Sequence, residues 1–160
     1  MLMVDQLCVV SMEFLSSLHI KIVHFPIALL FLYPFLELMS FFFKENIFSF
    51  TSLVILIIGV STSLLAVLTG NQAANSLGNT STEIKVLFEN HQTYANITVW
   101  LFTAILFSRI YLQIKKKYSG LLKIILLIIS FAGCYFIFQT GDYGGRTAHS
   151  RSAGVIQKGE

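Results

Sequence analysis

The sequence has few charged residues for its length. Of its 160 residues, 12% are charged and 55% are hydrophobic. A soluble domain of this size could not bury so much apolar surface. The scarcity of charge therefore excludes a soluble globular domain and predicts an integral membrane protein surrounded by lipid. The formal net charge of only +3 gives no reason to expect a nucleic-acid partner.

Cysteine and proline are also scarce. The two cysteines, Cys8 and Cys134, form neither a CxxC nor a CxxCH pattern, which argues against a structural disulfide and against covalently attached c-type haem. The two prolines, Pro26 and Pro34, fall in the first long apolar run, where each predicts a kink in a helix. The sequence has no acid/base dyad, nucleophile motif or phosphate loop, which argues against an enzyme acting alone.

The hydrophobic residues gather in four runs. Each is long enough to cross a hydrocarbon core of about 30 Å, which takes about 20 helical residues; they cover approximately 24–43, 48–68, 95–114 and 121–138. Lipid offers no hydrogen bonds to a bare backbone, so each run must be a helix. The expected fold is all-α, an integral membrane four-helix bundle with up-down-up-down topology. We assign 18–155 to this transmembrane domain, 1–17 to an N-terminal interfacial segment and 156–160 to a tail.

Basic residues predict the orientation of the bundle. Four lysines lie in or beside the loop between the third and fourth runs, namely Lys115, Lys116, Lys117 and Lys123. Short cytoplasmic loops carry an excess of Lys and Arg, so this loop is expected to be cytoplasmic. Both termini then lie on the outer side of a bacterial inner membrane. The first 17 residues have no basic start and contain Asp5 and Glu13, which does not fit a secretory signal peptide.

Two polar segments rich in turn residues flank the later spans. Residues 69–82 are rich in Asn, Gly, Ser and Thr and predict the longest ordered loop. Thr80-Ser81-Thr82-Glu83 fits a capping box, so the third helix is expected to begin before the membrane. After the fourth span, three glycines within 141–145 predict a tight turn. This turn would return the chain over the mouth of the bundle and bring His149 towards the other histidines.

All four histidines are expected at the outer end of the bundle. His19 and His24 open the first apolar run, His91 leads into the third and His149 follows the fourth. Neutral imidazole suits haem iron, copper and zinc, and a bundle can hold a macrocycle between helices with one histidine on each face. The preferred pair is His24 and His91, which stand on different helices at comparable depth. The alternative, polar residues that reach the membrane surface without a ligand role, is about equally well supported.

His91 is expected to lie on an apolar helical stripe that continues through Ala95 and Thr98. These small residues leave room for a flat group beside the imidazole. A ligating histidine also needs a hydrogen-bond partner for its second ring nitrogen, for which Gln92, Asn96 and Thr98 are candidates.

Two charged residues lie inside apolar runs. Glu37 is in the first run and Arg109 in the third, each nearer the cytoplasmic end. We expect either an ion pair between them or an Arg109 side chain that reaches the lipid headgroups. The residues between them and the histidines are mostly Leu, Phe and Ile, which argues against a proton path across the membrane.

Residues 19–30 carry a resemblance to a known family. Their sequence, His-Ile-Lys-Ile-Val-His-Phe-Pro-Ile-Ala-Leu-Leu, resembles the His-Pro-x-x-Val-His-Phe-Pro-Ile-Ala opening of a bacterial family of four-span membrane proteins carried as a domain of unknown function. Thr69-Gly70, His91 and the later Gly-Gly-then-His segment agree in order, and the likeness covers about 18–155. Ile20 stands where the family usually has Pro.

Members of that family resemble small b-type cytochromes, and some are joined to c-type cytochrome domains. The resemblance implies one or two haem b groups at the outer face. His24 and His91 carry over best as axial ligands, with His19 next; His149 matches only some members, because others have a histidine where this chain has Arg151. It also implies transfer of single electrons between a quinone or membrane partner and a periplasmic redox protein such as a c-type cytochrome.

A function of another class stays open at this point. The chain would be a non-catalytic membrane subunit of a larger respiratory or photosynthetic complex. Its histidines would then hold zinc or copper, or no metal. The small size and charge-poor helices fit this function equally well.

Overall fold

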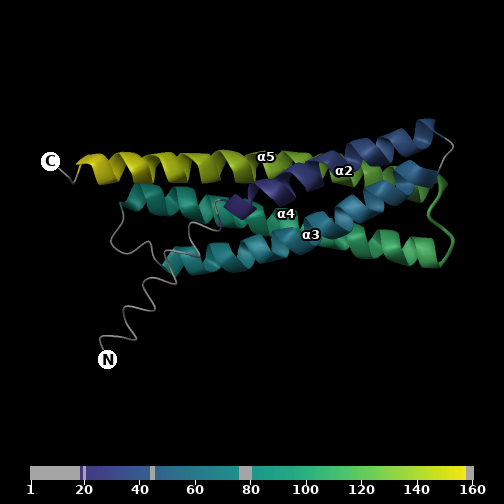
Figure 1. Ribbon diagram of the computed structural model, residues 1–160, viewed down its shortest axis with the longest axis horizontal. Helices are drawn as coiled ribbons and strands as arrows, with labels where there is room; N and C mark the ends of the chain where they lie inside the picture. Colours follow the sequence, from purple (N-terminus) through teal and green to yellow (C-terminus); the bar gives the residue numbers. More distant parts are fainter. Residues whose placement is uncertain (1–18, 20, 44–45, 76–80, 158–160) are drawn as a thin grey trace, which may run out of the picture.

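The computed structural model describes residues 19, 21–43, 46–75 and 81–157. Over these residues the protein is all-helical (Figure 1), with helices α2 (His24–Phe42), α3 (Asn46–Asn75), α4 (Thr82–Ile114) and α5 (Gly120–Gln157). The predicted interfacial segment, 1–17, lies outside the described residues, as does most of the predicted tail.

The four helices form an up-down-up-down bundle. The start of α2 and the end of α5 lie at one end, and the α2–α3 and α4–α5 connections lie at the other (Figure 1). We call these the histidine end and the lysine end. Helix α2 packs chiefly against α3, and α4 against α5. Each helix is long and apolar enough to cross a membrane, which confirms the predicted four-helix membrane bundle.

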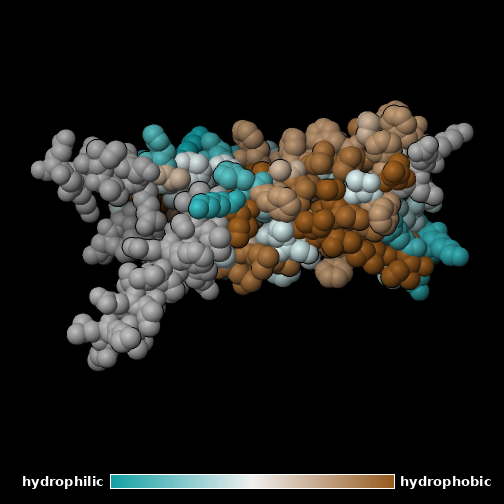
Figure 2. Space-filling view, viewed as in Figure 1, coloured by the Kyte–Doolittle hydropathy of each residue, from teal (hydrophilic) through white to brown (hydrophobic). Residues whose placement is uncertain are grey.

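Helices α4 and α5 are longer than a membrane crossing requires. They contain 33 and 38 residues, or about 50 Å and 57 Å at a rise of 1.5 Å per residue, against a hydrocarbon core of about 30 Å. Both run past the start of α2 at the histidine end (Figure 1). In Figure 2, hydrophobic side chains cover the visible face mainly over the length where α2 accompanies the other helices. The histidine end therefore extends beyond the apolar band.

At this end the first predicted break begins later than expected, and the second is wrong. Helix α3 continues to Asn75, through half of the segment expected to be a loop. Helix α5 continues through all three glycines to Gln157, so the chain does not turn back over the bundle. A glycine weakens a helix by only about 0.5–1 kcal/mol relative to alanine, and packing of α5 on α4 offsets that cost.

The predicted early start of the third helix is confirmed, because α4 begins at Thr82. Its N-cap residue, Ser81, makes no side-chain capping hydrogen bond. Pro34 lies within α2, and the helix continues beyond it to Phe42. Pro26 lies in the first turn of α2, where a missing N–H costs the helix little.

A buried apolar cluster fills the middle of the bundle and draws on all four helices. Its members are Leu30, Tyr33, Leu56, Val60, Phe102, Ile105, Leu106 and Ile137. Glycines allow close approach around it. A Cβ atom added at Gly133 of α5 would lie 2.7 Å from Phe102 Cε2, and one added at Gly59 of α3 would lie 2.7 Å from Leu30 Cδ2. The core therefore requires helices that nearly touch at these points.

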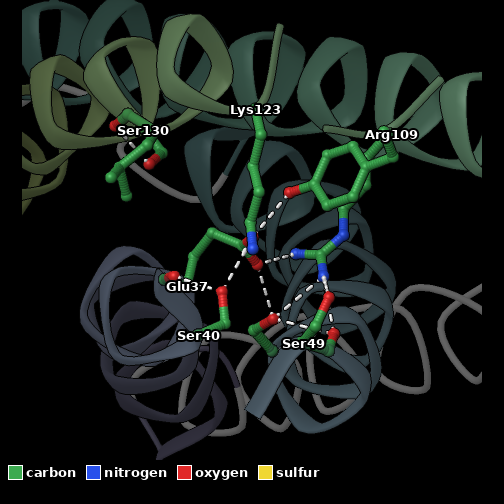
Figure 3. A network of polar contacts seen from close by, with 9 residues as sticks. Glu37, Ser40, Ser49, Arg109, Lys123 and Ser130 are labelled. Carbon is green, nitrogen blue, oxygen red and sulfur yellow. Dashed lines mark hydrogen bonds and ion pairs between the residues drawn. The ribbon is translucent and has the colours of Figure 1, made fainter. Parts of the chain in front are cut away.

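A buried ion pair lies near the lysine end, as one of the two alternatives for Glu37 and Arg109 predicted. Both side chains are fully buried, with Arg109 Nη1 2.5 Å from Glu37 Oε2 (Figure 3). The Ser52 hydroxyl donates to Glu37 Oε2 at 2.7 Å and the Tyr118 hydroxyl donates to Oε1 at 2.8 Å. Lys123 Nζ lies 3.5 Å from Glu37 Oε1. Glu37 of α2 is thus joined to α3, α4 and α5.

Arg109 has further partners of its own. Its Nη2 donates to the Ser49 carbonyl oxygen at 2.6 Å and to Ser52 Oγ at 3.0 Å. Its guanidinium carbon lies 5.5 Å from the ring centroid of Tyr33 and 4.8 Å from that of Tyr118, within reach of a cation–π interaction. The charge is therefore compensated by a carboxylate, two hydroxyl-bearing residues and two aromatic faces.

Replacing Arg109 with alanine should destabilise the bundle strongly. The substitution leaves the Glu37 carboxylate buried without its main counter-charge, and such changes cost about 3–5 kcal/mol. The free energy of unfolding in detergent micelles, followed by far-UV circular dichroism, measures this loss. Arg146→Ala is the control. The side chains of the Arg146–Asp142 ion pair are 61% and 34% exposed, respectively, so this pair should contribute little to stability. Equal losses in the two variants would show that the buried pair is not a main source of stability.

Candidate functional site

A cavity lies between the helices at the histidine end. Its empty volume, which includes space open to solvent, is about 730 Å³. All four helices and His19 line it. The lining is mainly apolar, and the polar residues on it are His19, Ser63, Asn71, His91, Gln92, Asn96, Thr98 and Thr140. Ala95 and Thr98, expected to leave room beside His91, both face this space.

Two of the four histidines meet at this cavity. The ring centroids of His19 and His91 are 6.4 Å apart, and the ring planes are inclined at 81°. His91 belongs to α4. His19 lies one turn before α2, where the Val23 N–H donates to the His19 carbonyl oxygen at 3.0 Å. The two imidazoles therefore reach one space from different parts of the chain.

Each of these rings has one nitrogen bonded to an oxygen. His91 Nδ1 lies 2.9 Å from the carbonyl oxygen of Thr140 on α5. Because a carbonyl only accepts, this Nδ1 carries a proton. His19 Nδ1 lies 3.1 Å from Thr69 Oγ1 on α3. The Thr69 hydroxyl donates to the carbonyls of Leu65 and Ala66, at 3.1 Å and 3.0 Å, so it accepts from His19.

With these bonds at Nδ1, the neutral form of each imidazole has the lone pair of Nε2 available. The pKa of His19 is lowered from its ordinary value, chiefly by burial and secondly by the neighbouring His91. A lowered pKa favours the neutral ring, which is the form that binds a metal ion. The site therefore presents two potential nitrogen ligands.

Glycines make space for both rings. A Cβ atom added at Gly144 would lie 3.0 Å from His91 Nδ1, and one added at Gly70 would lie 2.9 Å from His19 Cε1. Gly144 was expected to form a turn, but in α5 its role is steric, because the missing side chain lets His91 approach the helix backbone. Gly70 serves His19 in the same way on α3.

The other two histidines lie elsewhere. His24 is exposed and is not among the residues that line the cavity. It follows His19 by five residues, which is about 140° further around a helix, so the two side chains point different ways. His149 is exposed and lines a separate shallow groove with Glu83, Asp142 and other residues. It remains apart because α5 does not turn back.

Among the described residues, no group of three or more His, Cys, Asp or Glu side chains is arranged to hold a metal ion. The histidine end therefore offers a pair of imidazoles over this part of the chain, where the sequence predicted a larger cluster.

The partners of the imidazoles were not predicted. Gln92, Asn96 and Thr98 do line the cavity, but the Nδ1 atoms bond to Thr69 and Thr140. These partners belong to neighbouring helices, so the local sequence around a histidine does not indicate them. One sequence feature could have indicated these partners. Each threonine stands next to glycine, in Thr69-Gly70 and in the segment that follows Thr140.

The fold and composition define the chain as a multi-pass membrane protein with four helices. It belongs to the family described as predicted membrane protein (DUF2231), whose profile matches residues 16–157. This confirms the expected membership of a membrane-protein family of unknown function, and the description names no activity or cofactor. Neither the curated proteins nor the solved structures contain a match to the chain.

Gly144→Ala and Gly145→Ala should differ in their effect on stability although they are neighbours on α5. A Cβ atom at Gly145 meets nothing within 4 Å, so alanine there should raise the free energy of unfolding by about 0.5–1 kcal/mol. At Gly144 the added methyl group presses on the His91 ring and should cancel that gain.

Thermal unfolding in detergent measures the stability of both variants. The ring ¹⁵N chemical shifts of His91 report its hydrogen bond to Thr140, and only Gly144→Ala should move them. Identical behaviour of the two variants would contradict the close contact between Gly144 and His91.

Proposed function

We propose that this protein binds one haem b at the outer rim of the membrane, with His19 and His91 as its axial ligands. We propose further that it passes single electrons between a membrane partner or quinone and a redox protein on the outer side. The observation that carries the proposal is the pair of imidazoles whose ring centroids are 6.4 Å apart, each with Nδ1 bonded to an oxygen and Nε2 available.

The number of ligands favours haem over zinc. A porphyrin supplies four nitrogens to its iron, so the protein needs to provide only the axial positions. A zinc site takes three or four ligands from the protein. The described residues bring together two imidazoles and no third ligand of the usual kinds, which is the number that a haem requires.

The separation of the rings supports a shared metal centre. An imidazole nitrogen lies about 2.0–2.1 Å from a bound metal ion, and the ring centroid lies about 1.1 Å beyond the nitrogen. Two imidazoles on opposite faces of one ion therefore have centroids about 6.3 Å apart. The His19 and His91 centroids are 6.4 Å apart.

The surroundings of the rings are also those of ligands. Metal-binding histidines usually donate the second ring N–H to an oxygen, which fixes the ring and raises the basicity of the ligating nitrogen. Thr69 and Thr140 provide these oxygens. When bound, the haem would supply one-electron chemistry, while the mainly apolar lining would exclude water and influence the reduction potential.

This proposal changes the ligand pair expected from the sequence. His19 replaces His24 as the partner of His91, because His24 is exposed and does not line the cavity. A second haem between His19 and His149 is not included, since His149 lies in a separate groove. The proposed outer location is supported by Lys115, Lys116 and Lys117, which are exposed at the opposite end and favour a cytoplasmic position there. We also propose that the protein lies in a bacterial inner membrane and that its redox partner is a c-type cytochrome.

Spectra of the purified protein test the haem and its ligands together. Wild-type protein expressed with sufficient haem should show a Soret band, reducible α/β bands and a haem-to-protein ratio near one. His19→Ala and His91→Ala should each lose the low-spin spectrum, because each removes one axial nitrogen. His24→Ala and His149→Ala are matched controls at the same end of the bundle and should keep it.

Two results would count against the proposal. Purified protein without haem but with stoichiometric zinc or copper would support the competing function, a non-catalytic subunit of a larger membrane complex. Loss of the low-spin bands in His24→Ala, together with their retention in His19→Ala, would restore the pair His24 and His91. Far-UV circular dichroism of each variant separates loss of ligand from loss of fold.

A further inference from the structure

We infer that the two imidazoles are unequal, with His91 a fixed ligand and His19 an exchangeable one, so that a small neutral ligand of the carbon monoxide class can take the place of His19. This inference rests on the proposed function and concerns the same site. It follows from how each ring is attached to the bundle.

His91 is held by rigid elements on both sides. It lies within α4, more than two turns from the first residue of that helix, Thr82. Its Nδ1 bonds to the backbone carbonyl of Thr140, which lies inside α5. Gly144 on the same helix touches the ring, and the Phe88 ring lies 6.4 Å away. A carbonyl inside a helix has no torsion that could remove it from the imidazole, so His91 keeps its position.

His19 is attached through a weaker connection. It precedes α2, and Pro26 has no N–H, so the carbonyl of Ile22 cannot receive the usual helical hydrogen bond. Among the described residues, Val23 N–H donates to the His19 oxygen at 3.0 Å, and Ile27 N–H donates to the Val23 oxygen at a long 3.4 Å. Without the bond that Pro26 cannot make, the turn that carries His19 is tied to α2 less firmly than a continuous helix would tie it.

The oxygen that holds His19 is also less fixed than the one that holds His91. Thr69 Oγ1 is a side-chain atom of a partly buried residue on α3. It lies 3.1 Å from His19 Nδ1. The Thr140 carbonyl oxygen is 2.9 Å from His91 Nδ1. A single neutral hydrogen bond of this kind contributes about 0.5–1.5 kcal/mol, so release of His19 from Thr69 is a small barrier.

The replacement of His19 by the small ligand needs no further reactant. With haem bound, His19 Nε2 would release the iron and the incoming ligand would take the vacated position, so that one bond would replace another. No electron or proton moves, because the imidazole is neutral before and after it leaves. The empty volume of the cavity that both rings line includes open space, which gives a small molecule a way in.

Carbon monoxide binding to the reduced, haem-loaded protein tests this inference. The observed rate should reach a plateau as the carbon monoxide concentration rises, because departure of His19 then limits the reaction. Thr69→Val removes the oxygen that holds His19 and should raise the plateau roughly 2- to 10-fold. Thr62→Val is the matched control. Thr62 makes the same kind of bond to carbonyls of α3 but is not among the residues that line the cavity.

A second pair of variants does not depend on the folding of Thr69→Val. His19→Gly should recover a low-spin spectrum when imidazole is added, because imidazole can enter the vacated place. His91→Gly should recover it at least tenfold less well, since the fixed ligand is the one removed and the ring it leaves behind is the weakly held His19.

The outcomes separate this inference from the proposed function. A low-spin haem protein that forms no carbon monoxide adduct overturns the inference and leaves the function in place. Equal plateaus for Thr69→Val and Thr62→Val, or equal rescue of the two glycine variants, also overturn it. Failure of the protein to bind haem overturns both.

Discussion

The buried ion pair between Glu37 and Arg109 constrains how the four helices face one another. A charge inside a bundle must have its counter-charge and its hydrogen-bond partners within reach, so α2 and α4 have one rotation that satisfies it. Ser52 of α3 and Lys123 of α5 complete the same network (Figure 3). The contact fixes the lysine end of every helix, and the straight runs of helix carry that orientation to the histidine end.

At the histidine end, glycine has the complementary role. Gly70 of α3 and Gly144 of α5 let two imidazoles lie against helix backbones, where Thr69 and Thr140 bond to them. A side chain at either position would push the ring out into the cavity. The bundle therefore combines a buried, paired charge at one end with a pair of available ring nitrogens at the other, and an apolar core separates them.

Several features were predictable because they depend on composition or on sequence spacing. Apolar runs of the right length identified four membrane helices, and their alternation placed all four histidines at one end. Glu37 and Arg109 were recognised as possible partners, since an isolated charge in an apolar run needs one. The expected turns failed for a common reason. The polar segments after the second and fourth apolar runs have the residues of a turn, but 69–75 continue α3 and 141–145 continue α5, and both helices pack on their neighbours.

The sequence by itself determined that this is a four-helix membrane protein with its histidines at one end, because the length and polarity of each run leave no other stable arrangement in lipid. Only the tertiary structure decided which histidines meet. That outcome depends on the rotation of each helix about its axis, which places His19 inward and His24 outward. It also depends on contacts between residues about 50 positions apart, such as His91 with Thr140, and no local pattern contains them.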